Sequence, residues 1–287
     1  MPELHAAIVT PLNEQHQFDA PAMVRVMRHL ESRGLDGVVP CGTTGEGPSF
    51  SVSERISIIN TCVQHRGKLG IIAGTGCQSL ADTITLTHAA LTAGADAALV
   101  LPPFFYKQSG EAGVITWYQQ LCDALPLGSK IILYHIPPMT GVAITPAIID
   151  ALRESHRSYI YGVKDSGVNA EHTATLVSSY PMLKIYTGNA PILAQALNDG
   201  AFGSILAVAN IVPQALRQLT DNPKRGDIQA QVASVDGYVR KVGAVSTIKA
   251  ILHEAGIPVG LPLPPQLAHP DMSRAYAEFK AIGEYTG

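Results

Sequence analysis

The 287-residue sequence is poor in charged and aromatic residues, which make up 15% and 6% of it, and it has a single tryptophan. Its formal net charge is −3 and no segment is strongly basic, which argues against nucleic acid as the main partner. No clean apolar run reaches the ~18 residues of a membrane span, and no secretory signal pattern is present. These absences predict a cytoplasmic protein that binds neither membranes nor nucleic acid.

Cysteine is also scarce, and no local metal motif is present. Cys41, Cys62, Cys77 and Cys122 are widely spaced and form no C-x-x-C pair, and the histidines show no H-x-H or H-E-x-x-H spacing. Neither a zinc knuckle nor a redox dithiol is therefore indicated, and we expect reduced thiols. Ligands that are distant in the sequence can still converge in a fold, so only local metal motifs are excluded.

What the sequence does contain is a series of short apolar runs rich in β-branched residues. The runs are nearly continuous rather than alternating, as is typical of parallel strands covered on both faces. They predict eight strands, at His5–Thr10, Gly37–Pro40, Leu69–Gly74, Ala97–Leu101, Lys130–Tyr134, Tyr159–Lys164, Lys184–Thr187 and Gly203–Ala207.

Segments of helical period separate these strands. In 20–33 the apolar residues fall at helical spacing, and Ser79 and Gly94 are suited to cap a helix over 80–93. Strands that start about 20 to 33 residues apart, each followed by a helix, favour an α/β fold of the (β/α)8 TIM barrel type. A doubly wound open sheet is the alternative, because alternation by itself does not show closure.

No strand is indicated after Ala207, and the rest of the chain is predicted to be helical. The expected helices are Gly226–Val242, Val245–Ala255 and Asp271–Tyr285, with a proline-rich connection at Ile257–Pro265. We therefore predict a catalytic barrel over 1–222 and a C-terminal helical extension over 223–287.

One lysine has an unusual position. The chain has nine lysines, and only Lys164 ends the core of a predicted strand, where active sites of parallel barrels lie. Burying an ammonium is costly, which favours the neutral amine, and a neutral amine can form a Schiff base with a carbonyl compound. The structural alternative is a lysine that forms an ion pair with Asp165 or Glu46.

Two other strand ends carry polar groups suited to the same chemistry. Thr43 and Thr44 lie between Gly42 and Gly45, a turn whose amides and hydroxyls suit a carboxylate, although an ordinary tight turn fits as well. Tyr134 ends another strand and can relay protons or stabilise an oxyanion, although a lone tyrosine is more often structural. His135 follows it and should point outward, into the layer between barrel and helices.

Three motifs resemble one family when they are read in order. Gly42-Thr43-Thr44-Gly45-Glu46, Tyr134-His135-Ile136-Pro137 and Gly162-Val163-Lys164-Asp165-Ser166 follow successive predicted strands. The chain therefore resembles the dihydrodipicolinate synthase / N-acetylneuraminate lyase family over nearly its whole length. The resemblance implies a (β/α)8 barrel, class I chemistry on pyruvate or another 2-oxo acid, a homotetramer built as a dimer of dimers, and no metal or organic cofactor besides the covalent Schiff base.

The resemblance also implies roles for individual residues. Lys164 matches the Schiff-base lysine and Tyr134 the proton-shuttling tyrosine, while Thr43 and Thr44 match the pair that holds the keto-acid carboxylate. Backbone and wall positions near the lysine match Gly188 and Ile205. We add Gly42, Gly45, Ser166, Asn189, Met139, Phe105 and Tyr106 as further candidate substrate-binding residues.

The sequence departs from the family where the second substrate binds. Met139 stands in place of the arginine that grips the aldehyde's carboxylate in the synthases, and Phe105 in place of a relay tyrosine from a neighbouring subunit, with Tyr106 next to it. The sialic-acid lyases carry Ser-Thr at 43–44 and an acidic residue near Asn189.

These departures favour an aldolase or lyase acting on a 2-keto-3-deoxy sugar acid or a hydroxy-2-oxo acid. Dihydrodipicolinate synthase itself, a Schiff-base dehydratase and a non-catalytic 2-oxo-acid binding protein remain alternatives.

Overall fold

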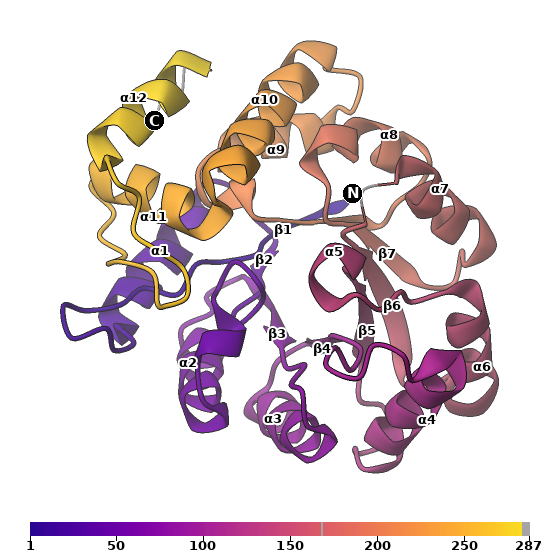
Figure 1. Cartoon of the computed structure of the whole chain (residues 1–287). Coiled ribbons are helices and arrows are strands. Elements are labelled where there is room, and N and C mark those ends of the chain that lie inside the picture. Colours follow the sequence, from indigo (N-terminus) through magenta and orange to yellow (C-terminus); the bar gives the residue numbers. More distant parts are fainter. Residues whose placement is uncertain (168, 283–287) are drawn as a thin grey trace.

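The computed structural model describes residues 1–167 and 169–282, and it contains a closed barrel of eight parallel strands. β8 pairs with β1 in register, and this pairing excludes the open sheet and confirms the predicted TIM barrel. Figure 1 shows the strands at the centre of a ring of helices. The strands are β1 (Glu3–Ala6), β2 (Gly37–Val38), β3 (Gly70–Gly74), β4 (Ala97–Val100), β5 (Ile131–His135), β6 (Ile160–Asp165), β7 (Lys184–Thr187) and β8 (Gly203–Leu206).

Local signals account for where many helices begin. Asp19 caps α1, Ser51 and Glu54 form a capping box on α2, and Ser79 caps α3, which ends at Gly94 in the left-handed conformation. The ring consists of α1 (Ala20–Ser32), α2 (Val52–Gln64), α3 (Leu80–Ala93), α4 (Gly110–Asp123), α6 (Pro146–His156), α7 (Ala170–Ser179), α8 (Leu193–Asn198) and α9 (Pro213–Asp221). The one-turn helix α5 (Pro137–Thr140) lies over the strands near the centre (Figure 1), and the 3-10 turns are η1 (Gly47–Ser49), η2 (Ala190–Ile192) and η3 (Val208–Asn210).

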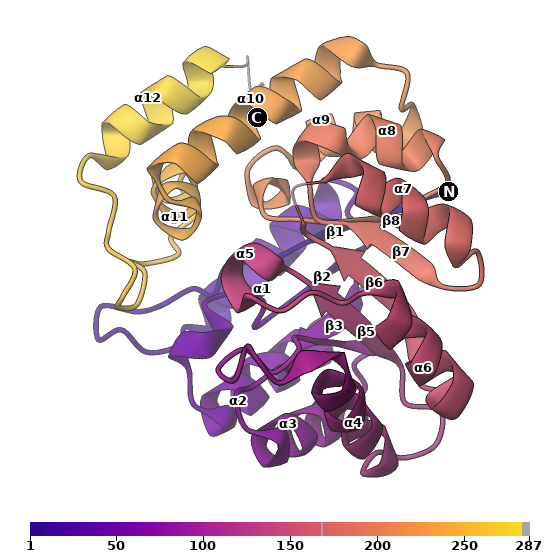
Figure 2. The same cartoon turned by 45° about the vertical axis from the view of Figure 1, so that its right-hand side comes forward.

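The chain continues after the barrel in three helices, α10 (Gly226–Val242), α11 (Ala244–Glu254) and α12 (Met272–Ile282). α10 packs on α9 and on the turns η2 and η3, and α11 packs on α12 (Figure 2). The predicted end of the last helix, 283–285, lies outside the described residues. The boundary at 222/223 stays a prediction.

The first strand is shorter and earlier than predicted. It covers Glu3–Ala6 rather than His5–Thr10, because the residues after Ala7 form hydrogen bonds with side chains and loops instead of with neighbouring strands. The amide of Val9 donates to the Asn210 side chain, and the Thr10 hydroxyl donates to the carbonyl of Gly45 at 2.6 Å. The apolar run therefore continues into the loop above β1 without remaining in the sheet.

Apolar side chains fill two regions. A small cluster inside the barrel includes Val39, Ile72, Leu99, Tyr134 and Ile205, and larger clusters lie between the strands and the helices. Alternate residues of each strand therefore face opposite layers. Of the helices in the described part of the chain, none has the length and apolarity needed to cross a membrane.

Candidate active site

Lys164 and Tyr134 lie side by side at the ends of neighbouring strands. The β5–β6 register pairs them directly, so both side chains face the barrel interior. Lys164 Nζ donates to the Tyr134 hydroxyl at 3.1 Å, and each residue is only 4% exposed. The lysine that the sequence singled out therefore meets a phenol inside the barrel.

The ion pairs considered for Lys164 as a structural alternative are not formed. The carboxylate of Asp165 points to the other side of β6, where it accepts hydrogen bonds from Thr173 and the Gly167 amide. Glu46 pairs with Lys249 instead. Within 1–167 and 169–282, no carboxylate lies within ion-pair distance of Lys164, so this lysine is not held in an ion pair.

The surroundings of Tyr134 favour its ionised form. Burial by itself raises the pKa of this phenol, but the charge of Lys164 and hydrogen bonds with Thr43, Lys164 and Ser166 outweigh burial and lower it below its ordinary value. A phenol with a lowered pKa beside an amine is suited to accept and return protons near that amine.

Residues 42–46, which we call the 42–46 loop, follow β2 and face this pair. The Thr43 hydroxyl lies 3.4 Å from the Tyr134 hydroxyl, and Thr44 is buried next to it. Gly45 has no room for a side chain, because a Cβ would lie 2.8 Å from the carbonyl of Ile8. Cys41 and Glu46, on either side of the turn, have positive φ angles of 57° and 56°, a strained arrangement common at functional sites.

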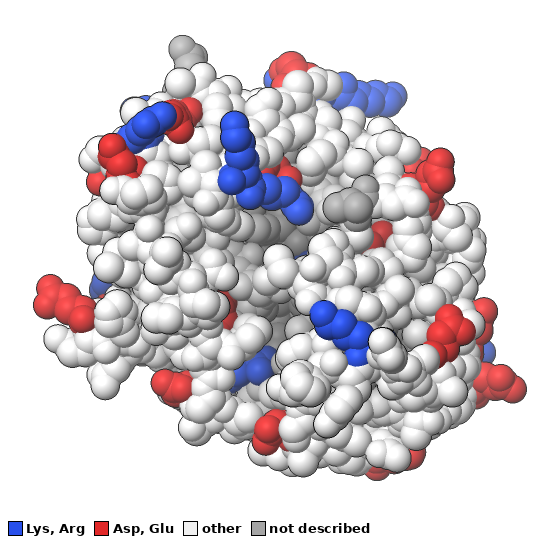
Figure 3. Space-filling model, in the orientation of Figure 1, with Lys and Arg blue, Asp and Glu red and all other residues white. Residues whose placement is uncertain are grey.

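A small pocket, partly open to solvent, lies beside Tyr134 and Thr43. Arg55 of α2 also lines it and donates to the carbonyls of Gly74 and Gly76, which fixes the loop after β3. Figure 3, drawn in the orientation of Figure 1, shows a hollow over the centre of the barrel, with Lys and Arg side chains at its upper and lower edges.

The ends of β6, β7 and β8 complete the wall near the lysine. The Gly188 amide donates to Asp165 O at 2.6 Å, and a Cβ at Gly188 would lie 2.0 Å from Ser166 Oγ, so a side chain there would displace the Ser166 hydroxyl. Ile205 is 1% exposed inside the barrel. The buried amide of Asn189 donates to the carbonyl of Gly167, so at least one of its N–H groups serves the neighbouring loop.

The chain matches known proteins over nearly its full length. The model of the dihydrodipicolinate synthetase family matches residues 2–281. The chain belongs to this family. An uncharacterized DapA-like lyase of Chloroflexus aurantiacus is 43% identical over 252 residues, 86% of this chain and 84% of that protein. A 4-hydroxy-tetrahydrodipicolinate synthase of Corynebacterium diphtheriae is 33% identical over 269 residues, 91% of this chain and 87% of that protein.

Solved structures of the family have the same fold. N-acetylneuraminate lyase of Proteus mirabilis superimposes with a TM-score of 0.90 at 25% identity, with 99% of each chain covered. YagE, a prophage protein of E. coli K12 solved in complex with pyruvate, gives a TM-score of 0.90 at 24% identity, with 98% of each chain covered. By its match to the family model and to the DapA-like lyase, the chain is a DapA-like lyase of a carbon–carbon lyase family whose chemistry is class I and pyruvate-dependent.

The predicted specificity residues of this family member lie at the rim. Phe105, Tyr106 and Met139 are 64%, 75% and 68% exposed. Phe105 and Tyr106 contact each other edge to face, with ring centroids 5.2 Å apart. Among the described residues, no hydrogen bond or ring contact joins these three side chains to Lys164 or Tyr134. Their part in substrate binding stays a prediction.

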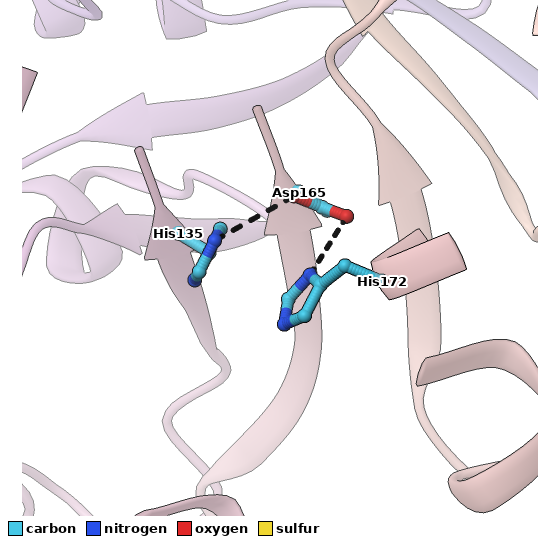
Figure 4. A group of neighbouring side chains, drawn as sticks. All are labelled: His135, Asp165 and His172. Carbon is cyan, nitrogen blue, oxygen red and sulfur yellow. Dashed lines mark hydrogen bonds and ion pairs between the residues drawn. The ribbon is translucent and has the colours of Figure 1, made fainter. Parts of the chain in front are cut away.

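His135, Asp165 and His172 form a cluster on the outer side of β5 and β6 (Figure 4). Burial and the nearby His172 lower the pKa of His135, whose ring stacks on His172 at 4.3 Å. The Ile144 amide donates to His135 Nδ1, which keeps the proton of the neutral ring on Nε2. His172, Thr173 and the Gly167 amide already donate to Asp165. These atoms are engaged with one another, so the cluster fits a structural role better than a metal site.

Two buried cations near the 42–46 loop were not predicted from the sequence. Arg55 and Lys249 are 4% and 2% exposed, although both lie in helices where an exposed charge is the ordinary expectation. A visible signal is that Lys249 interrupts the apolar segment Val245–Leu252. A single lysine within an apolar segment does not reveal which carboxylate or carbonyl will be its partner.

Proposed function

We propose that this chain is a class I aldolase that forms a Schiff base between Lys164 and pyruvate or a related 2-oxo acid. One observation carries the proposal: the buried amine of Lys164 has the Tyr134 hydroxyl at 3.1 Å and no carboxylate partner among the described residues. A lysine side chain that is not held in an ion pair can reach a carbonyl carbon, and the adjacent phenol supplies the proton transfers that imine formation needs.

The chemistry then follows from the bonds involved. The Lys164 amine adds to the ketone carbon, and loss of water gives an iminium that withdraws electrons from the neighbouring methyl group. Loss of a proton from that carbon gives an enamine, which forms a carbon–carbon bond with an aldehyde. Hydrolysis releases the product and restores the amine, and the reverse sequence cleaves it. Tyr134 carries protons in both directions.

The 42–46 loop is assigned to the carboxylate of the 2-oxo acid. Thr43 contacts Tyr134, so a carboxylate held by the loop lies next to the carbon that Lys164 attacks. Preorganised donors hold this charge through both directions of the reaction without rearranging. Gly42 and Gly45 allow the backbone to approach the anion closely, and Gly188 and Ile205 form the opposite wall.

The product of the addition, which is also the substrate of the cleavage, is assigned to a 2-keto-3-deoxy sugar acid or a hydroxy-2-oxo acid, and the second substrate is the corresponding aldehyde. Met139, Phe105 and Tyr106 give the rim an apolar character with one hydroxyl, which favours an aldehyde less anionic than aspartate semialdehyde. Ser166 and Asn189 are assigned to hydroxyl groups of that aldehyde. The synthase, dehydratase and binding-protein alternatives predict, respectively, turnover of the semialdehyde, release of water without pyruvate, and no turnover.

Trapping with borohydride in the presence of pyruvate tests the Schiff base. We expect a pyruvyl adduct in the intact mass of the wild-type protein, none in Lys164→Ala, and full trapping in the control Lys107→Ala, which removes an exposed loop lysine. An adduct that persists in Lys164→Ala would overturn the assignment. Pyruvate release across a panel of 2-keto-3-deoxy acids, with aspartate semialdehyde in parallel, identifies the second substrate.

We further propose that the chain assembles as a homotetramer, a dimer of dimers, as the family resemblance implies. The exposed rings of Phe105 and Tyr106 beside the rim of the site support a subunit contact there. Sedimentation velocity tests this. A tetramer that dissociates in Phe105→Ser/Tyr106→Ser supports the contact, and a wild-type monomer refutes the proposal. The cytoplasmic location stays a prediction.

A further inference from the structure

We infer that Lys249 and Glu46 are a positioning pair through which the C-terminal helices hold the 42–46 loop in its binding conformation. The inference rests on the proposed function, because it assigns the loop to the carboxylate of the 2-oxo acid. It adds two residues that do not touch the substrate but set the affinity for it. Lys249 lies in α11 and Glu46 ends the loop that contains Thr43 and Thr44.

The pair is fully buried. Lys249 Nζ lies 2.6 Å from Glu46 Oε1, and their side chains are 2% and 1% exposed. The ammonium also donates to the carbonyl of Leu261, and the other carboxylate oxygen of Glu46 accepts from the Leu263 amide at 2.6 Å. Both charged groups are thus held by α11 and by the chain segment that follows it, and each needs the other to remain buried.

Glu46 is where this attachment reaches the loop. Its φ angle of 56° is unfavourable for a residue with a side chain, so the surroundings must hold it there. The Glu46 amide donates to the carbonyl of Thr43 at 3.1 Å, which closes the turn that presents the two threonines. A release of the Glu46 side chain therefore loosens the turn at Thr43, and with it the contact between Thr43 and Tyr134.

A second attachment joins the same segment of the C-terminal region to the loop above β1. The Leu12 amide donates to the carbonyl of Val259 at 3.0 Å, and a Cβ at Gly260 would lie 2.1 Å from the carbonyl of Leu12. Thr10, two residues before Leu12, donates to Gly45 within the 42–46 loop. Residues 259–263 therefore hold two adjoining loops at the open end of the barrel, one directly and one through Glu46.

A merely stabilising pair and a positioning pair predict different results. If the pair only stabilises the fold, its loss lowers the melting temperature and leaves the pyruvate affinity of the folded protein unchanged. If it positions the loop, its loss weakens pyruvate binding even where the protein is fully folded, because Thr43 and Thr44 no longer stand in the geometry that receives the carboxylate.

The experiment measures the pyruvate concentration at half-maximal borohydride trapping, for the full chain and well below the melting temperature. We expect a rise of about tenfold or more in Glu46→Gln and in Lys249→Met, with trapping still complete at saturating pyruvate. The double variant should show less than the product of the two single effects, because the two residues act as one unit. Circular dichroism establishes that each variant is folded.

Asp236→Asn is the matched control. It removes the ion pair between Asp236 and Arg240 within α10, in the same C-terminal region but without contact to the loop, and it should leave half-saturation unchanged. Unchanged half-saturation in folded Glu46→Gln overturns the inference, and this near-isosteric variant decides the question if Lys249→Met does not fold. If the wild-type protein traps no pyruvate, the proposed function fails instead, so the two failures are distinguishable.

Discussion

Lys164 Nζ donates to the Tyr134 hydroxyl at 3.1 Å from the neighbouring strand, and the two residues occupy the same register position in the β5–β6 ladder. The backbone hydrogen bonds of a parallel sheet therefore fix the distance between the nucleophile and the proton carrier. Neither group depends on a flexible loop for its place. Side chains on strands are positioned more accurately than those on loops, which suits a reaction with several proton transfers.

Replacing Tyr134 by phenylalanine should lower the rate of adduct formation by about 10² to 10³, because a general acid–base group contributes on that scale. The volume of the side chain is nearly conserved, so the fold should be retained. Rapid quench with borohydride measures the rate. Tyr161→Phe is the matched control on β6, and it should react at the wild-type rate. Equal rates in the two variants would remove Tyr134 from the proton relay.

The rate of adduct formation should rise with pH over the range in which the Tyr134 phenol ionises. Because Lys164 and the surrounding hydrogen bonds lower the pKa of this phenol, its ionised form is populated at lower pH than that of a free tyrosine. A step that uses the phenolate as base therefore becomes faster as pH rises through this lowered pKa, below pH 10. This rise should vanish in Tyr134→Phe, and identical profiles for the two proteins would contradict the assignment.

Replacing Thr44 by valine should raise the half-saturating pyruvate concentration about ten- to a hundredfold, because a hydrogen bond to a charged group contributes about 1.5 to 3 kcal/mol. The substitution keeps the shape of the side chain and removes only its hydroxyl. Thr44→Ser keeps the hydroxyl and should stay within about threefold of the wild type. Pyruvate titration followed by trapping and mass measurement compares the three proteins.

Asp165→Asn should destabilise the fold by about 2 to 4 kcal/mol, because it disturbs a buried carboxylate that accepts from His172, Thr173 and the Gly167 amide. Asp123→Asn is the matched control, since Asp123 also pairs with a histidine but is 70% exposed, and it should change stability by less than about 0.5 kcal/mol. Denaturant unfolding at pH 7 measures both.

The same cluster gives an expectation for metals. Because the atoms of His135, Asp165 and His172 are engaged with one another, a chelator or added Zn²⁺ should leave the melting temperature and the trapping of pyruvate unchanged. A rise in melting temperature with Zn²⁺ that is lost in His172→Ala would instead identify a metal site.

Glu3, the first residue of β1, should make the free energy of unfolding depend on pH in the acid range. Burial alone would raise its pKa, but hydrogen bonds with His5 and Tyr186 and the charge of Lys184 lower it from 4.5 to about 2. The unfolded chain binds more protons in this window, so stability is complete above about pH 4.5 and falls as pH decreases toward 2. Glu3→Gln should remove about 1 to 2 kcal/mol at pH 7 after allowance for solvent screening, and should flatten the pH dependence. Glu14→Gln, which changes an exposed residue, is the control, and it should leave the loss of stability at acid pH unchanged.

The sequence by itself determined the elements of the barrel and the residues at its strand ends. Continuous apolar runs at regular intervals predict parallel strands, and a strand that ends in Val163-Lys164 places its lysine at the open end of a barrel. These are local properties, because the period of the apolar residues reports which faces of a segment are buried. The predicted strands differ from the observed ones at their ends, as at β1, where the apolar run continues beyond the sheet, and the short helix α5 was not predicted.

Only the tertiary structure decided closure of the sheet and the partners of the charges. Asp165 follows Lys164 in the chain yet faces the opposite side of β6, and Glu46 meets Lys249 from the C-terminal helices rather than the lysine of the site. The contact between Glu46 and Leu263 joins residues 217 positions apart. A buried charge takes its partner from whatever the fold brings near it, and no local period of the sequence carries that information.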